Sequence, residues 1–435
     1  MSDLLILNGR VIDPATGVDG LRDVLLRRGR VAAVEMPGEL RWTNAMETLD
    51  ALGMVVAPGL IDVHVHLREP GQTYKESIAT GTAAAAAGGF TSVVAMPNTL
   101  PVNDSVAGLR WMLDEARGAC TNLFAMPAAT FGSRGEEITD FHELQRAGAV
   151  GFTDDGKPLL HDRVMREALV AAAGIGVPVS QHAEDTRLTG GCSMNAGPLA
   201  FRLGLRGMTN ESETRIVERD IRLLRDIERS EGLRPHLHVQ HVSTTGAMEA
   251  IRRAKKDGLH VTCEVAPHHF TLTDEAVGEY DTNTKMNPPL RAELDRKAMI
   301  AGLMDGTADC IATDHAPHAT FEKEQEFERA PNGITGLETA LGLALRVLHR
   351  GEGMSLSRLI ALMSRQPAEV MSLKGRGSLE VGSFADAVVF DPTAEWSFAV
   401  KASRSKSRNT PFDGATMVGR VMATICEGRV VYRGN

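Results

Sequence analysis

Two histidines separated by one residue, followed by an arginine, stand in the segment DVHVHLREPG (residues 62–71). In an extended strand, side chains two residues apart point to the same face, so His64, His66 and Arg68 are expected to share one face. The apolar residues between them are expected to pack on the other face. A buried face does not accommodate two imidazoles and a guanidinium unless each finds a polar partner. The segment therefore predicts a functional site.

More histidines and acidic residues stand where other apolar segments end. They are Asp154 and Asp155 in AVGFTDDG, His182 in VPVSQHAED, His241 in HLHVQHVS and Asp314 in CIATDHAPH. Imidazole and carboxylate groups together suit zinc or a similar ion, and a set without thiolates favours an open, catalytic site. Taken singly, a histidine at a strand end is more often hydrogen-bonded or solvated, and an aspartate there often caps the next helix. A shared location would favour a metal centre.

The segments between these residues predict how the chain positions them. Apolar segments of strand length alternate with helical patterns such as YKESIATGTAAAAAGG and DRVMREALVAAAGIG. Eight such units predict an α/β fold of the (β/α)8 TIM-barrel type, in which the carboxyl ends of all strands converge on one rim. A doubly wound open sheet is the alternative, but no Gly-x-Gly-x-x-Gly motif follows an early strand. The barrel would bring residues 64 to 314 into one pocket.

The two ends of the chain show a different pattern, with short strands and turns. Similar Gly-Arg-Val sequences, interpreted as turns, occur at residues 8–11 and 427–430. We expect residues 1–57 and 366–435 to form one small β-sandwich domain, and residues 58–365 to form the catalytic barrel. Two unrelated β segments are the alternative.

Composition restricts the class of protein. The 435 residues carry a net charge of -9 and are 43% hydrophobic, which suits one large domain and a smaller one. The acidic balance argues against nucleic acid and anionic membranes as general partners. Five scattered cysteines favour reduced thiols, and no secretory or membrane-spanning segment stands out. A cytoplasmic location is expected.

Eight motifs together resemble a known family. In chain order they are DVHVHLREPG, MPNT, FTDDG, QHAED, HVSTTGA, MNPPLR, TDHAPH and NGITGLET. From about residue 4 to 432 the chain resembles dihydroorotases of the bacterial class I type, in the amidohydrolase superfamily. The resemblance implies two Zn²⁺ ions per chain, one held by His64, His66 and Asp314, the other by His182 and His241, with Asp155 as the bridge. Many superfamily members bridge with a carboxylated lysine instead; Lys157 is interpreted as a solvated loop residue.

Arg68 is suited to bidentate binding of a carboxylate, although a salt bridge with Glu69 is the alternative. Two divalent ions beside Arg68 would leave the pocket net positive, which favours an anionic substrate. The resemblance also assigns substrate contacts to His66, Asn98, Asn287, His318, Asn332 and Gly333. In the family a phenylalanine often precedes this glycine, where the present chain has Asn332.

The resemblance implies the reversible conversion of (S)-dihydroorotate to N-carbamoyl-L-aspartate, a step of pyrimidine biosynthesis. A metal-bridging hydroxide would attack the ring amide, and Asp314 would move the proton to the departing nitrogen. Residues 316–335 could close over the substrate or form a static surface loop. The rivals are a dihydropyrimidinase, hydantoinase or allantoinase, which Arg68 and Asn98 disfavour, and an inactive scaffold for a carbamoyltransferase. A homodimer is expected, and association with aspartate carbamoyltransferase remains open.

Overall fold

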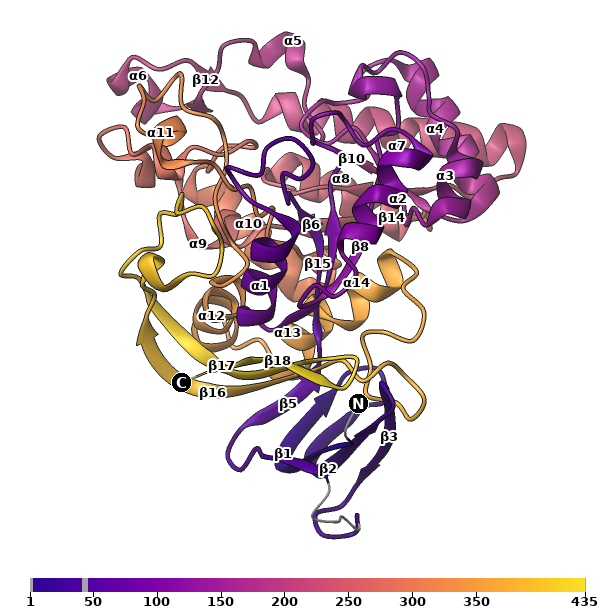
Figure 1. The fold of residues 1–435 in the computed structure, drawn as a ribbon. Helices are drawn as coiled ribbons and strands as arrows, with labels where there is room; N and C mark the ends of the chain where they lie inside the picture. Colours follow the sequence, from indigo (N-terminus) through magenta and orange to yellow (C-terminus); the bar gives the residue numbers. More distant parts are fainter. Residues whose placement is uncertain (1–2, 41–45, 435) are drawn as a thin grey trace.

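The computed structural model describes residues 3–40 and 46–434, which form a barrel and a sheet beneath it (Figure 1). Within these residues eight short parallel strands form the barrel. They are β6 (Leu60–Val65), β7 (Phe90–Ala95), β8 (Asn122–Ala125), β9 (Phe152–Thr153), β10 (Pro178–Gln181), β13 (His236–Val239), β14 (Val261–Val265) and β15 (Cys310–Ile311). Two isolated parallel bridges join the neighbouring strands that have no longer ladder between them. Ala125 at the end of β8 pairs with Ala149 before β9, and Val65 at the end of β6 pairs with His315 after β15. The predicted fold class is confirmed.

Helices connect successive barrel strands and pack against their outer faces. The longer connections are α1 (Ile78–Ala87), α2 (Val106–Glu115), α3 (Phe141–Ala147), α4 (Asp162–Ile175), α7 (Glu211–Glu231), α8 (Thr245–Lys256) and α10 (Glu293–Asp305). After β15 follow α12 (Ala340–Ala344), the π-helical turn η4 (Leu345–Gly351), α13 (Leu356–Met363) and α14 (Arg365–Val370). Their apolar faces bury one large core with the strands, as helices packed on a parallel sheet require.

Short elements lie in the loops above the carboxyl ends of the strands. They are α5 (Thr186–Thr189), β11 (Met194–Asn195), α6 (Pro198–Leu203), β12 (Gly207–Met208), α9 (Pro267–Thr271), α11 (Thr320–Lys323) and the 3₁₀ turns η1 (Phe131–Ser133), η2 (Asp274–Val277) and η3 (Thr282–Thr284). Figure 1 shows α5, α6, α11 and β12 together at one end of the molecule. That end therefore carries most of the loop structure that surrounds the predicted pocket.

The two ends of the chain form a single mixed sheet. Its strands are β1 (Leu4–Asp13), β2 (Val18–Arg27), β3 (Arg30–Glu35), β4 (Glu47–Asp50), β5 (Val55–Pro58), β16 (Ala387–Ser397), β17 (Thr416–Cys426) and β18 (Arg429–Arg433); the turn η5 (Val400–Ala402) precedes β17. The order is β18-β17-β16-β5-β1-β2-β3, with β4 paired to β1. Both halves of the sheet contribute to one apolar core, separate from the barrel core. Figure 1 shows β16–β18 between the barrel and β1–β3.

The predicted turn at residues 8–11 is wrong, whereas a turn does join β17 to β18. β1 runs unbroken from Leu4 to Asp13, and its register against β2 shifts between Ile6 and Gly9. Asn8 has a φ of 60°, and a Cβ on Gly9 would lie 2.4 Å from the side chain of Val56. The Asn-Gly pair therefore forms a bulge that lets β5 approach β1 closely.

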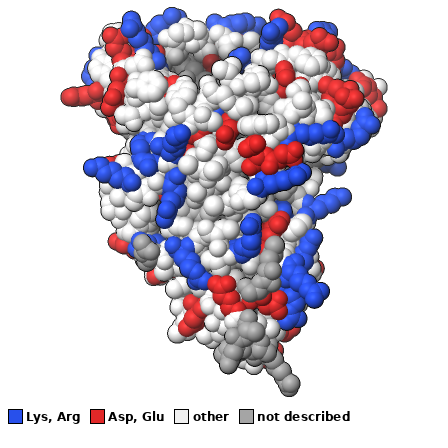
Figure 2. All heavy atoms as spheres, in the orientation of Figure 1, with Lys and Arg blue, Asp and Glu red and all other residues white. Residues whose placement is uncertain are grey.

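The surface carries both signs of charge. On the face that Figure 2 shows, lysine and arginine side chains are interspersed with aspartate and glutamate side chains. No helix in the described part of the chain is long and apolar enough to cross a membrane.

Candidate metal centre and substrate cavity

A cavity of about 250 Å³ opens at the carboxyl ends of the barrel strands. Its walls are formed by His66, Arg68, Asn98, Asp155, Gly156, His182, His241, Met286, Asn287, Asp314, Ala316, His318 and Asn332. His64 lies fully buried next to this wall. The barrel thus brings together residues spread over some 270 positions of the sequence, as the prediction from strand ends required.

The predicted route by which Arg68 reaches the cavity is wrong. β6 ends at Val65, its register against β7 is already irregular after Asp62, and Arg68 has a φ of 59°, outside a strand conformation. Arg68 is nevertheless buried, and its Nε donates to the Pro317 carbonyl at 3.1 Å. In the described residues the alternative pairing with Glu69 is absent, because the Glu69 carboxylate accepts from the Ile78 N–H at the start of α1 (2.8 Å).

Strained backbone accompanies the site. Arg68, His241 and Asp314 all have left-handed φ values, of 59°, 33° and 47°. For residues other than glycine, such conformations cost about 1–3 kcal/mol each and gather where surrounding structure holds a functional side chain in place. Here each one follows a barrel strand and turns its side chain toward the cavity.

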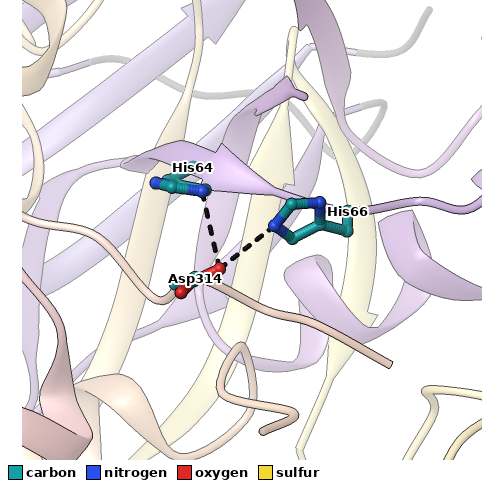
Figure 3. Close-up of side chains that lie close together, drawn as sticks. All are labelled: His64, His66 and Asp314. Carbon is teal, nitrogen blue, oxygen red and sulfur yellow. Dashed lines mark hydrogen bonds and ion pairs between the residues drawn. The ribbon is translucent and has the colours of Figure 1, made fainter. Parts of the chain in front are cut away.

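His64, His66 and Asp314 form the first candidate metal cluster (Figure 3). The Oδ1 atom of Asp314 lies 3.1 Å from Nε2 of His66 and 3.5 Å from Nε2 of His64. Asp155 faces the same histidines, at 3.4 Å from each Nε2 through its two oxygens. Two imidazole nitrogens and carboxylate oxygens at these separations are a donor set that zinc prefers.

Glu264 fixes the orientation of His64. The buried Nδ1–H of His64 donates to Oε1 of Glu264 at 2.5 Å, so the lone pair of Nε2 faces Asp155 and Asp314. That Nε2 is buried and has no hydrogen-bond partner among the described residues. An orphaned imidazole lone pair held by a carboxylate on the other nitrogen is the usual arrangement of a metal ligand. The residues present therefore fit a cation at this point.

The second candidate cluster consists of His182, His241 and Asp155. Nδ1 of His182 lies 2.9 Å from Nε2 of His241 and 3.8 Å from Oδ1 of Asp155, and the same Asp155 oxygen lies 3.6 Å from His241. Glu184 accepts from Nε2 of His182 at 2.9 Å, which directs the Nδ1 lone pair toward the cluster. Asp155 also lies near His64 and His66, and it forms a further candidate ligand group with His64 and His241, so this carboxylate lies between the two pairs of histidines.

The electrostatics of the clusters point to a missing positive charge. Burial opposes ionisation of Asp155, yet His64 and His241 lower the pKa of Asp155 well below its usual range. Burial and the nearby Asp155 and Glu264 carboxylates raise the pKa of Asp314 above its usual range. Burial lowers the pKa of His241 to about 4, which leaves its ring neutral. By contrast, the surrounding carboxylates outweigh burial and raise the pKa of His64 and of His182, so protons and a divalent cation compete for these two rings.

The other predicted substrate residues differ in their placement. Nδ2 of Asn98 donates to the Asp155 carbonyl (2.6 Å), and Nδ2 of Asn287 donates to Glu184 (2.8 Å). Both side-chain oxygens are buried without a partner among the described atoms, so they remain available to a ligand. Gly333 is not part of the cavity wall, because its N–H donates to the Lys285 carbonyl and it packs beneath His318.

The remaining sequence interpretations concern residues beside the site. Lys157 is exposed, and Asp154 accepts from the Thr130 N–H at 2.9 Å, so neither is a ligand candidate. Residues 316–335 include α11 and pack against the protein through the buried amino group of Lys323, which donates to the Pro331 carbonyl at 2.8 Å. Sequence reasoning missed Glu264 and Glu184; a charged residue inside the apolar segment VTCEV was the available signal for Glu264.

Solved structures identify the class of protein that combines this barrel with this cavity. An L-hydantoinase (dihydropyrimidinase) from Arthrobacter aurescens matches with a TM-score of 0.87 at 25% identity, covering 100% of this chain and 96% of that one. A dihydropyrimidinase from Brevibacillus agri NCHU1002 matches with a TM-score of 0.83 at 23% identity, covering 99% and 95%. The fold and the histidine–carboxylate site thus define an amidohydrolase-type barrel.

Sequence relatives identify the family within that class. The dihydroorotase of Geobacter sp. (strain M21) is 48% identical over 432 residues, 99% of both chains. The dihydroorotase of Trichlorobacter lovleyi is 48% identical over 434 residues, 99% of this chain and 100% of the relative. A family model described as dihydro-orotase-like matches residues 53–246. The chain belongs to the dihydroorotase family.

Proposed function

We propose that this chain is an active dihydroorotase, which interconverts (S)-dihydroorotate and N-carbamoyl-L-aspartate in pyrimidine biosynthesis. The observation that carries the proposal is the presence of the Arg68 guanidinium in the cavity that also holds both histidine–carboxylate clusters. A guanidinium recognises a carboxylate through paired hydrogen bonds. Dihydroorotate combines such a carboxylate with the ring amide that the reaction opens. Family membership supports the same activity.

We propose two zinc ions per chain. His64, His66 and Asp314 would hold one, His182 and His241 the other, and Asp155 would contact both. The support is the donor group of His64, His66 and Asp314, the approach of His182 to His241 and Asp155, and the unpartnered Nε2 of His64. When bound, such ions lower the pKa of a coordinated water toward neutrality and polarise the amide carbonyl.

The chain's own groups would bind the substrate and move the proton. Arg68, Asn98 and His318 would contact the carboxylate, and Asn287 would orient the ring through its unpartnered oxygen. In hydrolysis, Asp314 would accept a proton from the attacking water and return it to the ring nitrogen as the C–N bond breaks. Its burial and raised pKa suit a carboxyl group that must hold a proton briefly.

A dihydropyrimidinase or hydantoinase is the second candidate, since the two solved structures carry those names. Hydantoin and dihydrouracil lack the carboxylate, so a buried Arg68 would stay without its partner in such an enzyme, which is costly. An allantoinase is disfavoured for the same reason. An inactive scaffold would not require both clusters, and every implied ligand is present.

The test is a comparison of dihydroorotate, dihydrouracil, hydantoin and allantoin with the same zinc-loaded protein, following ring opening by loss of ultraviolet absorbance. We expect the specificity constant for dihydroorotate to exceed the others at least a hundredfold. A preference for dihydrouracil or hydantoin would move the chain to the second candidate. Inactivity on all four, with both metals bound, would support the scaffold.

We further propose that residues 1–57 with 366–435 form one domain and residues 58–365 the other. We also propose that the protein is cytoplasmic. Finally, we propose that it forms a homodimer able to associate with aspartate carbamoyltransferase. The shared sheet of both chain ends supports the division, and five free cysteines support a reducing compartment. Light scattering of the protein, alone and with the carbamoyltransferase, tests the assembly. A monomer in both samples contradicts it.

A further inference from the structure

A buried lysine lies behind the substrate cavity and has no role in the proposed reaction. The side chain of Lys75 is 9% exposed and does not form part of the cavity wall. Its Nζ lies 3.0 Å from Oε1 of Glu322 in α11 and 3.4 Å from Nδ1 of His318. Burying an ammonium group is costly unless acceptors surround it, so this placement requires a specific reason.

Lys75 and the Asn332 carbonyl together determine which nitrogen of His318 carries the proton. An ammonium group has donors only, so Nδ1 of His318 must accept from Nζ of Lys75. The proton therefore sits on Nε2, which donates to the Asn332 carbonyl at 2.9 Å and lies 3.4 Å from Nη2 of Arg68. Burial, then Arg68 and Lys75, lower the pKa of His318 to about 2, consistent with a neutral ring. The Asn332 carbonyl, on the cavity wall beside Arg68, already accepts this N–H, so a substrate carboxylate would share the bond or replace that carbonyl.

We propose that Lys75 is a positioning and specificity-determining residue, which with the Asn332 carbonyl holds His318 in the tautomer that can donate to the substrate carboxylate. This proposal rests on the proposed dihydroorotase function. Without Lys75, Nδ1 of His318 could donate to Oε2 of Glu322, which lies 3.6 Å away, and only the Asn332 carbonyl would then oppose a lone pair on Nε2. The contribution of Lys75 would therefore act through His318 and would depend on an anionic substrate.

Contacts around Glu322 hold the lysine in this position. Oε2 of Glu322 accepts from the Ala319 N–H at 2.9 Å, which keeps the carboxylate turned inward. Beside it, the ring of Tyr74 stacks on that of Phe321, with centroids 6.0 Å apart. These contacts join the loop after β6 to α11, so that Arg68 and His318, which come from the two segments, keep a fixed separation.

A double-mutant cycle on the zinc-loaded protein tests the proposal, with Lys75→Met, His318→Asn and the double variant. Lys75→Met should raise KM for dihydroorotate about ten- to a hundredfold, the loss expected for a charge-assisted contact, with kcat changed less than about threefold. In the His318→Asn background the same change should have less than about a threefold effect on KM, because Lys75 acts through that ring.

Three controls separate this role from a structural one. Lys75→Gln keeps a donor toward His318 without the charge and should fall between wild type and Lys75→Met. Lys75→Met with Glu322→Gln removes the unpaired carboxylate, so the KM effect should persist in a protein that melts as wild type does. The exposed Lys401→Met should match wild type.

Equal KM effects of Lys75→Met with and without His318, or a loss of kcat alone, would overturn the proposal. A wild type without dihydroorotase activity would instead overturn the proposed function.

Discussion

Replacing Glu264 by glutamine should weaken metal binding while leaving the chemistry of the loaded site nearly intact. Three N–H groups converge on this buried carboxylate: Nδ1 of His64 at 2.5 Å, Nε2 of His238 at 3.0 Å and the backbone of His241 at 3.1 Å. The donors outweigh burial and hold the pKa of Glu264 well below its usual range, so it is ionised at neutral pH. Glutamine keeps the shape and removes the charge.

The magnitude follows from these contacts. The amide oxygen can replace Oε1 and still accept from His64 and His241, whereas the new NH₂ group faces a donor on His238. That ring can change tautomer and donate to Oγ1 of Thr262 at 2.9 Å, so the loss in folding free energy should be about 1–3 kcal/mol. Loss of the charge behind a ligating histidine should reduce zinc affinity about 10- to 100-fold.

The assay is a zinc titration against a competing chelator, followed by turnover at saturating zinc. We expect the variant to need about 10–100 times more free zinc for half-maximal activity and to reach a kcat within about threefold of wild type. Glu338→Gln, which changes a half-buried glutamate that accepts from Ser403 outside the cavity, should leave the zinc requirement unchanged. Unaltered zinc affinity in Glu264→Gln would refute the assignment of His64 as a ligand oriented by this carboxylate.

Three further predictions concern the metal clusters and the loop beside them. Asp314→Asn should retain most of its metal and bind dihydroorotate, but turn over about 10²–10⁴-fold more slowly, since an amide cannot carry the proton; a near-normal kcat contradicts this role. His182→Ala with His241→Ala should reduce two ions per chain to one by elemental analysis, and two retained ions would contradict the second cluster. Burial lowers the pKa of Lys323 to about 7, below its value in the unfolded chain. The stability of wild type relative to Lys323→Met should therefore rise with pH between about 7 and 10.5, and a constant difference in melting temperature would contradict that burial.

The barrel was predictable because its strand and helix patterns are local. Short apolar segments and intervening helices follow from residue type and spacing, and the rule that strand ends share a rim then brought His182, His241 and Asp314 together. The predicted strand through Arg68 was wrong because the chain leaves the sheet after Val65, which pairs with Ala95 of β7 on one side and with His315, in the loop after β15, on the other. That geometry depends on tertiary contacts, which the alternation of polar and apolar residues in the sequence does not reveal.

Residues that support the site were harder to predict than residues that form it. Glu264 orients His64 across 200 positions of sequence, and Lys75 meets His318 across 243. Such pairs depend on which strands and loops become neighbours when the barrel closes, so residue type alone does not pair them. Likewise, Asn8 and Gly9 resemble a turn locally, and only the pairing of β1 with β2 makes them a bulge.

The central claim is that a metal site and a carboxylate-binding arginine act on one substrate in this cavity. Its most direct test is the ratio of kcat/KM for dihydroorotate to that for dihydrouracil, measured in wild type and in Arg68→Met with equal metal content. We expect a high ratio in wild type and a fall of about ten- to a few hundredfold in the variant, entirely through dihydroorotate, since a charge-assisted contact is lost. An unchanged ratio, or an equal loss on both substrates, would contradict the claim.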